Sequence, residues 1–306
     1  MAGDRRAVLL MAYGSPRTED EVEPYFTDIR GGRPPSPEAL EELTGRYRRI
    51  GGSPLNEITE RQARELGKLL DEERQGEFAV FVGMKHWHPL IADTIREIVE
   101  QGISQVIGLV LAPHFSSKSI GEYEQRIRRA SMALGAEVDL QIVKSWYDHP
   151  SFVRLVGDNL KVTLRGWDPD EPATRVFFTA HSIPSRIVAG GDPYAEQLED
   201  SARLYAAAAG FARFETAWQS ASPTGEPWLG PDILEALSEF GRGGGRRALV
   251  APVGFVSDHL EVLFDVDVEC AERAQELGLE LRRIPSPNYD PRFIRALAAI
   301  VMGYAS

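Results

Sequence analysis

The chain has 306 residues, of which 43% are hydrophobic and 26% charged, a globular composition that excludes fibrous and intrinsically disordered classes. Its net charge of −12 argues against partners that are nucleic acids or anionic membrane surfaces. The sequence shows neither the ~18-residue apolar run of a membrane span nor a signal-peptide pattern, so we expect a cytoplasmic protein without integral membrane association. Cys270 is the only cysteine, so one chain cannot form an internal disulfide or hold an iron–sulfur cluster by itself.

Short apolar runs alternate with longer amphipathic segments along the chain. The runs are continuously hydrophobic, which is typical of parallel strands buried on both faces. They are Ala7–Ala12, Phe78–Val82, Gln105–Leu111, Val138–Val143, Val176–Thr179, Phe214–Trp218, Ala248–Ala251 and Leu279–Ile284. Helical spacing of apolar residues follows at Pro89–Gln101, Glu122–Leu134, Tyr194–Gly210 and Val268–Leu277. This alternation predicts an α/β fold with right-handed crossovers.

The eight predicted strands divide into two similar sets of four. The first strand of each set leads into a related turn, Ala12-Tyr13-Gly14-Ser15-Pro16 in one and Ala180-His181-Ser182-Ile183-Pro184 in the other. We therefore predict two similar half-domains, residues 1–147 and 148–285, each with a four-stranded parallel sheet and with a ligand cleft between them. Residues 286–306 are predicted to form a C-terminal helix that packs back on the first half.

The first crossover of the N-terminal half is about twice as long as the others. Its insert, about residues 14–60, carries glycine- and proline-containing stretches that a simple crossover helix does not need, and we interpret it as a substrate-binding wall. Planar guanidinium groups suit carboxylates, so its arginines predict a clamp for an anionic substrate. A surface helix with ordinary charge pairs explains them equally well. These arginines are Arg30, Arg33, Arg46, Arg48 and Arg49.

All six histidines lie just beyond the carboxyl ends of predicted strands, where open parallel sheets bind ligands. They are His86, His88, His114, His149, His181 and His259. His181 is the sharpest candidate, because it follows a buried run and Pro184 stops the strand soon after it. Its imidazole is predicted to project into the cleft as a base or a metal ligand. The alternative is a capping contact to the next turn.

Three carboxylates follow the seventh predicted strand at intervals of four residues: Glu261, Asp265 and Glu269. In an α-helix this spacing puts them on one face, and their apolar neighbours predict that the segment is largely buried. A buried carboxylate must be paired with a cation or neutralised by a proton, so we predict a path for metal ions or protons. An acidic face open to solvent is the alternative interpretation.

Several segments, taken in chain order, resemble motifs of the ferrochelatase family. They are Gly51-Gly52-Ser53-Pro54-Leu55 with Thr59, Ala112-Pro113-His114-Phe115-Ser116, Phe178-Thr179-Ala180-His181-Ser182-Ile183-Pro184, Trp218-Gln219-Ser220 with Glu226-Pro227-Trp228-Leu229-Gly230-Pro231, and Asp258-His259-Leu260-Glu261. The resemblance implies two Rossmann-like, chelatase-like halves around a porphyrin cleft and the insertion of ferrous iron into the macrocycle, a step of heme biosynthesis. Tyr13 resembles the coproporphyrin III type, in which this tyrosine can ligate the product iron.

The resemblance also implies roles for individual residues. His181 and Glu261 match the catalytic metal pair for Fe²⁺, and Asp265 and Glu269 would carry protons or hydrated metal. Tyr13 and His181 occupy corresponding positions in the two halves and should face each other across a flat ligand. The matched porphyrin contacts are Tyr13, Arg30, Arg46, Tyr47, Ser53 and Tyr123, with Lys85 and His86 at the cleft mouth.

Coproporphyrin III and Fe²⁺ are the implied substrates, with no tightly bound cofactor. We expect a monomer that makes transient contacts with neighbouring heme-pathway enzymes. Two alternatives stay open at the level of sequence. One is a chelatase for another metal or tetrapyrrole, including protoporphyrin IX. The other is a non-enzymatic tetrapyrrole carrier, which would need no base and is therefore disfavoured by the His181–Glu261 pair.

Overall fold

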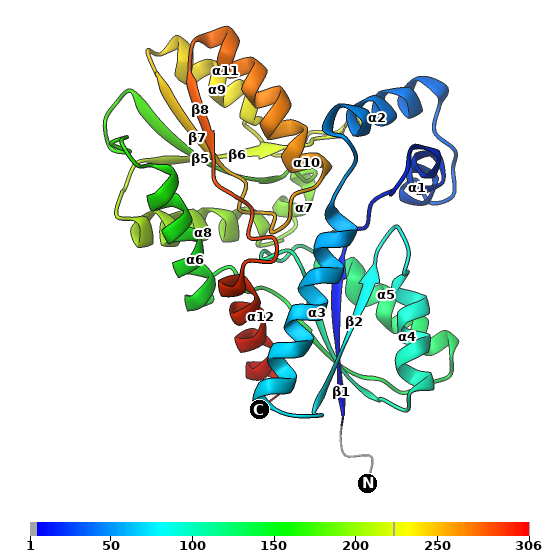
Figure 1. Cartoon of the computed structure of the whole chain (residues 1–306). Helices are drawn as coiled ribbons and strands as arrows, with labels where there is room; N and C mark the ends of the chain where they lie inside the picture. The colour runs from blue at the N-terminus through cyan, green and yellow to red at the C-terminus, as the bar shows by residue number, and fades with distance from the viewer. Residues whose placement is uncertain (1–4, 223, 306) are drawn as a thin grey trace.

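The computed structural model describes residues 5–222 and 224–305, and its strands form two four-stranded parallel sheets (Figure 1). The N-terminal sheet has the order β2-β1-β3-β4, with β1 Arg6–Ala12, β2 Phe78–Met84, β3 Gln105–Val110 and β4 Asp139–Val143. The C-terminal sheet repeats this order as β6-β5-β7-β8, with β5 Thr174–His181, β6 Phe214–Gln219, β7 Arg247–Ala251 and β8 Glu280–Arg283. The predicted α/β class and the two parallel sheets are confirmed.

Helices connect the strands and cover both sheets. In the first half they are the 3₁₀ turn η1 Glu19–Glu21, α1 Val22–Ile29, α2 Pro37–Ile50, α3 Leu55–Glu73, α4 Ile91–Glu100 and α5 Ile120–Ala133. In the second half they are α6 Pro150–Thr163, α7 Ser185–Ala189, α8 Tyr194–Ala209, α9 Ile233–Arg242, α10 Leu260–Leu263, the π turn η2 Asp265–Cys270, α11 Ala271–Leu277 and α12 Pro291–Tyr304. Among the described residues, no helix is long and apolar enough to cross a membrane.

One hydrophobic core runs through both halves. Helix α12 packs against α3 of the first half and α6 of the second, and α6 packs against α8, so these helices lie between the two sheets (Figure 1). The ring of Phe152 on α6 contacts Trp146, Tyr205 and Phe293, with centroid separations of 4.9, 5.9 and 6.0 Å. Separating the halves would expose this apolar surface to water, which opposes their separation. The domain limits at 147/148 and 285/286 stay a prediction.

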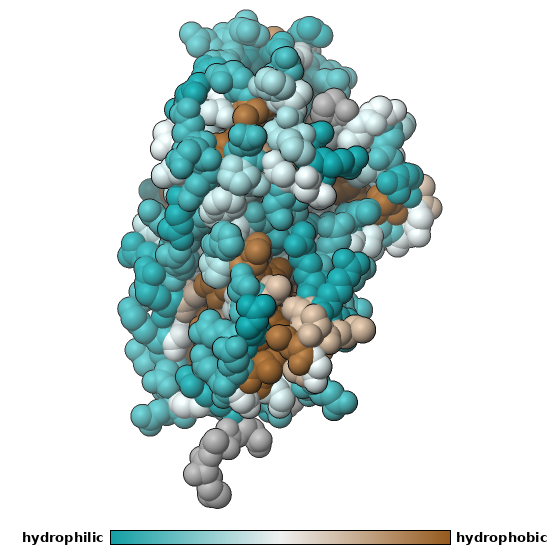
Figure 2. Space-filling model, turned by 90° about the vertical axis from the view of Figure 1, so that its right-hand side faces the viewer, coloured by the Kyte–Doolittle hydropathy of each residue, from teal (hydrophilic) through white to brown (hydrophobic). Residues whose placement is uncertain are grey.

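The outer face of each sheet has its own apolar layer. Helices α4 and α5 cover the N-terminal sheet, and α9 and α11 cover the C-terminal sheet (Figure 1). The outward surfaces of these amphipathic helices remain polar. Figure 2, which views the molecule from the side of α1, α4 and α5, shows a mainly hydrophilic face with apolar atoms gathered in its lower part.

The insert of the first half reaches across to the second half. Ser36 caps α2 by accepting a hydrogen bond from the amide of Ala39, and Gly51 ends the helix in a left-handed conformation (φ 73°). Tyr25 and Tyr47 form a small buried cluster against Leu260 of α10. Helices α1 and α2 thus stand apart from the N-terminal sheet and rest on the element that carries Glu261.

The loop after β3 joins the two halves through polar contacts with α8. His114 Nε2 lies 2.9 Å from Ser201 Oγ, whose hydroxyl donates to the Leu198 carbonyl, so the imidazole must be the donor. The amide of Phe115 donates to Gln197 Oε1 at 2.7 Å. Burial lowers the pKa of His114 to about 3, because an imidazolium there would lose its hydration.

Replacing His114 should change how the free energy of unfolding depends on pH. With a folded pKa below the unfolded value of 6.5, neutral His114 contributes stability at neutral pH that is lost as the pH falls toward 3. Between about pH 6 and about pH 4, His114→Gln should therefore lose unfolding free energy less steeply than wild type, by up to about 1.4 kcal/mol per pH unit. Urea titrations across this range measure the slope, and the exposed His88→Gln serves as control. Equal slopes for wild type and H114Q would contradict the assignment.

Candidate active site

The parallel pairing of the C-terminal sheet assembles one side of the site. Strand β5 lies between β6 and β7, so the carboxyl ends of all three meet at one edge. His181 is the last residue of β5 and pairs in register with Gln219, the last residue of β6. The chain leaving β7 turns into α10, which carries Glu261. Residues distant in sequence are therefore adjacent, as expected at the ligand-binding edge of an open parallel sheet.

His181 and Glu261 face each other at this edge. His181 Nε2 lies 3.7 Å from Glu261 Oε2, a buried oxygen with no hydrogen-bond partner among the described residues. His181 Nδ1 contacts the carbonyl of Ser182, which can only accept, so Nδ1 carries the proton of the neutral ring and Nε2 keeps its lone pair. Two metal–ligand bonds of about 2.1 Å each can span this separation, so one cation can contact both atoms.

A third carboxylate stands beside this pair. The Ser220 hydroxyl and Gln219 Nε2 both donate to Asp265 Oδ2, the second at 3.3 Å. Burial and the neighbouring Glu261 carboxylate together raise the pKa of Asp265 to about 7. Burial also raises the pKa of Glu269. Asp265 can therefore take up and release a proton near neutral pH, which supports a path for protons along this row.

The segment that carries these carboxylates is not the one continuous α-helix that the sequence predicted. Helix α10 ends at Leu263, and residues 265–270 form a π turn in which the amide of Glu269 donates to the Phe264 carbonyl five residues back, at 2.9 Å. The predicted helix at Val268 therefore starts within this turn. In an α-helix, residues four apart are rotated by about 40°. The wider π turn reduces that rotation and brings the carboxylates closer to one line, and such turns are frequent at functional sites.

Tyr13 lies after β1, at the corresponding edge of the N-terminal sheet. Its ring centroid is 4.5 Å from that of His86, and Lys85 Nζ lies 5.5 Å from the rings of both Tyr13 and Tyr123. Gly14 allows the turn (φ 88°), and a Cβ there would approach Trp87 Cβ to 2.8 Å. The structure thus brings four of the predicted site residues together on one wall.

The polar groups of this wall are paired beneath its surface. Lys85 Nζ contacts Glu122 Oε2 at 2.7 Å, and His86 Nδ1 contacts Asp28 Oδ2 at 2.7 Å. Burial lowers the pKa of Lys85, and it lowers the pKa of His86 to about 4 although Asp28 opposes the shift. The imidazole is therefore neutral at physiological pH, with Nδ1–H donating to Asp28 and Nε2 unprotonated.

The two walls are electrostatically coupled. The pKa of Tyr13 is raised by burial and, next, by the carboxylate of Glu261 on the opposite half. Tyr13 nevertheless has 38% of its surface exposed, so its ring borders open space and not the core. This arrangement agrees with a slot between the two residues. That Tyr13 and His181 face each other across a ligand stays a prediction.

The remaining predicted contacts come from the insert and lie in different environments. Arg46 rests 5.1 Å above the Phe264 ring and pairs with Glu42 at 2.8 Å. Its charge partly opposes the rise in the pKa values of Asp265 and Glu269 that burial causes. The other three are the buried Tyr47, whose Oη accepts from Ser15 at 3.3 Å, Ser53, whose Oγ accepts from the Leu55 amide at 3.4 Å, and Arg30, which is exposed and 5.6 Å from the Phe26 ring. The contacts of Arg30 and Ser53 are both local and do not join either residue to the other predicted site residues.

Three residues of the site carried no assigned role in the sequence. Gln219 donates to the Glu261 carbonyl at 2.7 Å, and Ser220 holds Asp265. His259 donates from Nδ1 to the Ser257 carbonyl at 2.9 Å, and both His181 and Glu261 influence its pKa, which burial lowers. Their positions just beyond β6 and β7 were the available signal, because the predicted edge of the sheet includes them.

Comparison with known proteins decides the family. The model of the family described as ferrochelatase matches residues 5–304, nearly the whole chain. The chain belongs to the ferrochelatase family. A protein named ferrochelatase from Herpetosiphon aurantiacus is 44% identical over 301 residues, which cover 98% of this chain and 99% of that protein.

Other relatives in the family carry a more specific name. Proteins named coproporphyrin III ferrochelatase are 43% identical in Oceanobacillus iheyensis, over 96% of this chain and 95% of that protein, and 42% identical in Bacillus subtilis, over 99% and 98%. Among solved structures, SirB from Bacillus subtilis with Fe³⁺ superposes with a TM-score of 0.62 at 14% identity, covering 99% of this chain and 96% of that one. This likeness confirms the chelatase-like fold that the family resemblance implied.

The electrostatic link across the slot can be tested without any ligand. Removing the Glu261 charge in Glu261→Gln should lower the pKa of Tyr13, because the phenolate would no longer face a carboxylate. The pKa is measured from the pH dependence of absorbance near 295 nm, with Tyr13→Phe subtracted to isolate this ring. Glu124→Gln, on the same half as Tyr13, is the control. An unchanged Tyr13 pKa in E261Q would contradict the facing arrangement.

Proposed function

We propose that the protein is a lyase-class enzyme that inserts Fe²⁺ into coproporphyrin III, releasing two protons and forming the iron coproporphyrin of heme biosynthesis. The observation that carries this proposal is the His181–Glu261 pair, in which an unprotonated imidazole Nε2 lies 3.7 Å from a buried carboxylate oxygen that no described residue hydrogen-bonds. Membership of the ferrochelatase family and the names of relatives at 42% to 43% identity support the choice of metal and porphyrin.

The site offers a metal ion few ligands, as a site that must pass the ion on to the porphyrin requires. Within the described ranges, no group of three or more histidine, cysteine, aspartate and glutamate side chains could close around a metal ion. His181 and Glu261 are thus two ligands and not a cage. Imidazole and carboxylate both bind Fe²⁺, and a two-ligand hold leaves coordination positions free for the pyrrole nitrogens that take the ion over.

Two pyrrole N–H protons must be removed as the metal enters. His181 Nε2 accepts the first proton while it does not hold the ion, because its single lone pair can bind either the ion or a proton. Asp265, with its pKa near 7, accepts protons from the same edge and passes them toward Glu269. On the other wall, the Tyr13 phenol is placed to ligate the product iron. Arg46 supplies positive charge for a propionate at the end of the row.

The proposal also includes the setting of the enzyme. One cysteine, Cys270, lies buried in the core of the second half, so we propose that the chain binds no iron–sulfur cluster and needs no resident cofactor. We place the protein in the cytoplasm as a monomer, on the grounds of its acidic composition and its soluble-type α/β sequence pattern.

Anaerobic Fe²⁺ insertion followed by absorbance tests the activity. Wild type should metallate coproporphyrin III faster than protoporphyrin IX. His181→Ala and Glu261→Gln should each lower turnover by at least about 100-fold, because a positioned acid–base group typically contributes 10²–10⁴. His88→Ala, which changes an exposed histidine, is the control and should keep full activity.

The outcomes separate the alternatives. Near-normal iron insertion by H181A would reject the catalytic assignment. Preference for protoporphyrin IX, or for Co²⁺ over Fe²⁺ in a competition assay, would reject the proposed substrates but keep a chelatase. Tight porphyrin binding by wild type without turnover would make the protein a carrier.

Tyr13 should act on the product more than on the chemistry of insertion. In Tyr13→Phe we expect iron insertion to persist, while the absorbance spectrum of the bound iron product changes because its phenol ligand is missing. The comparison is made on freshly metallated wild type and variant, and Tyr289→Phe, an exposed tyrosine outside the site, is the control. Identical product spectra in wild type and Y13F would contradict the ligand role.

A further inference from the structure

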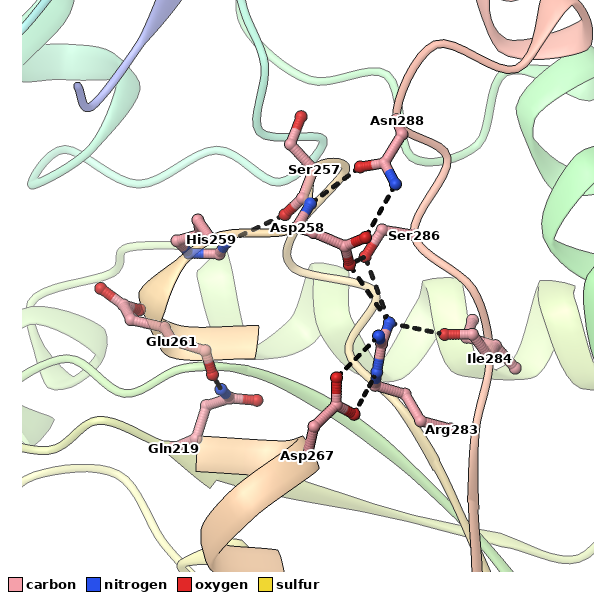
Figure 3. Close-up of polar contacts among 10 residues, drawn as sticks. All are labelled: Gln219, Ser257, Asp258, His259, Glu261, Asp267, Arg283, Ile284, Ser286 and Asn288. Atoms are coloured by element: carbon pink, nitrogen blue, oxygen red, sulfur yellow. Dashed lines mark hydrogen bonds and ion pairs between the residues drawn. The ribbon is translucent and has the colours of Figure 1, made fainter. Parts of the chain in front are cut away.

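A polar network lies behind the segment that carries Glu261, on the side away from the slot. Arg283, at the end of β8, is its centre, with 17% of its side chain exposed. Its guanidinium binds Asp267 through two hydrogen bonds, of 2.6 and 2.9 Å, and Asp258 through one of 3.3 Å. Figure 3 shows Arg283 between these two carboxylates and the side chain of Glu261 on the opposite side of the segment.

The two aspartates bracket the catalytic segment. Asp258 comes three residues before Glu261, and Asp267 comes six residues after it, inside the π turn. One guanidinium therefore fixes both ends of a stretch that changes from loop to α-helix to π turn. Because the planar guanidinium holds its donors in fixed directions, it sets the separation of the two ends as well as attracting them.

The network extends from the second half into the first. Asn288 accepts a hydrogen bond from the Asp258 amide and donates one to Asp258 Oδ2, both at 2.8 Å. Gln62, fully buried on α3, donates to the Asn288 carbonyl at 2.6 Å and to Ser257 Oγ at 3.1 Å. Asn288 adopts a left-handed conformation (φ 46°), uncommon outside glycine, and these contacts compensate for its cost.

We propose that Arg283 is a positioning residue for Glu261, acting through Asp258 and Asp267, and that Asn288 and Gln62 tie the position of the metal-site segment to helix α3. Helix α3 begins within the predicted insert at Leu55 and contacts the segment that leads to Glu261 through Gln62, at its second turn. The network thereby fixes the position of the proposed metal ligands relative to the N-terminal half. The expected effect on the rate of iron insertion rests on the proposed function. The expected effect on the backbone of the Glu261 segment does not.

The structural consequence is tested first, without substrate. In Arg283→Met, backbone hydrogen exchange measured by mass spectrometry should become faster in residues 257–270 and stay unchanged in β5 and β6. The matched control is Arg282→Met, because Arg282 precedes Arg283 in β8 but contacts Trp167 and the carbonyls of Thr163 and Arg165. Unchanged exchange at 257–270 in R283M, or equal changes in R282M, would overturn the proposal whether or not the protein inserts iron.

The kinetic consequence is tested on the same variants. R283M should lower kcat for Fe²⁺ insertion by about 10- to 100-fold, since a misplacement of about 1 Å can cost this much. The Kd for coproporphyrin III, measured by absorbance without metal, should stay within about twofold of wild type. Arg283→Lys should recover only part of the loss, because a single ammonium cannot reproduce the two-bond hold on Asp267.

A milder variant protects the test against misfolding of R283M. Asn288→Asp keeps the shape, the acceptor for the Asp258 amide and tolerance of the left-handed conformation, but it replaces the donor to Asp258 with a repelling carboxylate. It should lower kcat in the same direction with porphyrin affinity unchanged. Wild-type kcat in both R283M and N288D, or a fall in kcat matched by an equal loss of porphyrin affinity, would overturn the positioning role. If the wild-type protein does not insert iron, the proposed function is rejected. The positioning role of Arg283 is then decided by the hydrogen-exchange result.

Discussion

The site depends on the parallel pairing of β5 with β6 and β7, which forces three strand ends to one edge. His181 ends β5, Gln219 ends β6, and the chain leaving β7 carries Glu261. No local feature of sequence brings an imidazole to 3.7 Å from a carboxylate 80 residues later in the chain; the register of the sheet does so. Desolvation then gives the pair its chemistry, because a carboxylate oxygen without a partner is far more attractive to a cation in the protein than in water.

The side of the site that carries His181 and the side that carries Tyr13 differ in their electrostatics. The side of His181 is acidic: Glu261 Oε2 has no hydrogen-bond partner among the described residues, and the pKa of Asp265 is about 7. On the side of Tyr13, Lys85 forms an ion pair with Glu122, and the neutral His86 ring donates a hydrogen bond to Asp28. The carboxylates beside His181 attract cations, while the side of Tyr13 presents the aromatic rings of Tyr13 and Tyr123 next to Lys85. The two sheets have the same strand order, so the difference between the two walls comes from the residues in the loops that follow the strands.

Much of this fold could be predicted from the sequence, because buried parallel strands are continuously apolar. Residues 7 to 11 of β1 are fully buried, and they stand out as hydrophobic without any alternation. His181 and Tyr13 could be found for a related reason, since polar residues directly after such runs lie at the ligand-binding edge. The π turn could not, because its apolar spacing matches that of an ordinary helix. The tertiary contacts of this segment, among them those of Arg283 and Gln219, come from residues distant in the sequence.

The polar partners were the least predictable part. Gln62 and Asn288 are 226 residues apart and look like ordinary polar side chains of a helix and a loop. Only the packing of α12 and the preceding segment against α3 brings them together. The pairing of His86 with Asp28 is hidden for the same reason, because α1 belongs to an insert whose orientation no local pattern specifies.

The core shared by the two halves constrains how a broad, flat molecule can enter. A hinge that parted the sheets would have to pull α12 away from α3 or α6 and expose rings such as Phe293 and Phe152. Helices α1 and α2 are attached less firmly: their link to the C-terminal half is a small apolar cluster at Leu260, the Arg46–Phe264 contact and an exposed Arg49–Glu272 ion pair. A displacement of these two helices would therefore disturb less buried apolar surface than a separation of the two sheets.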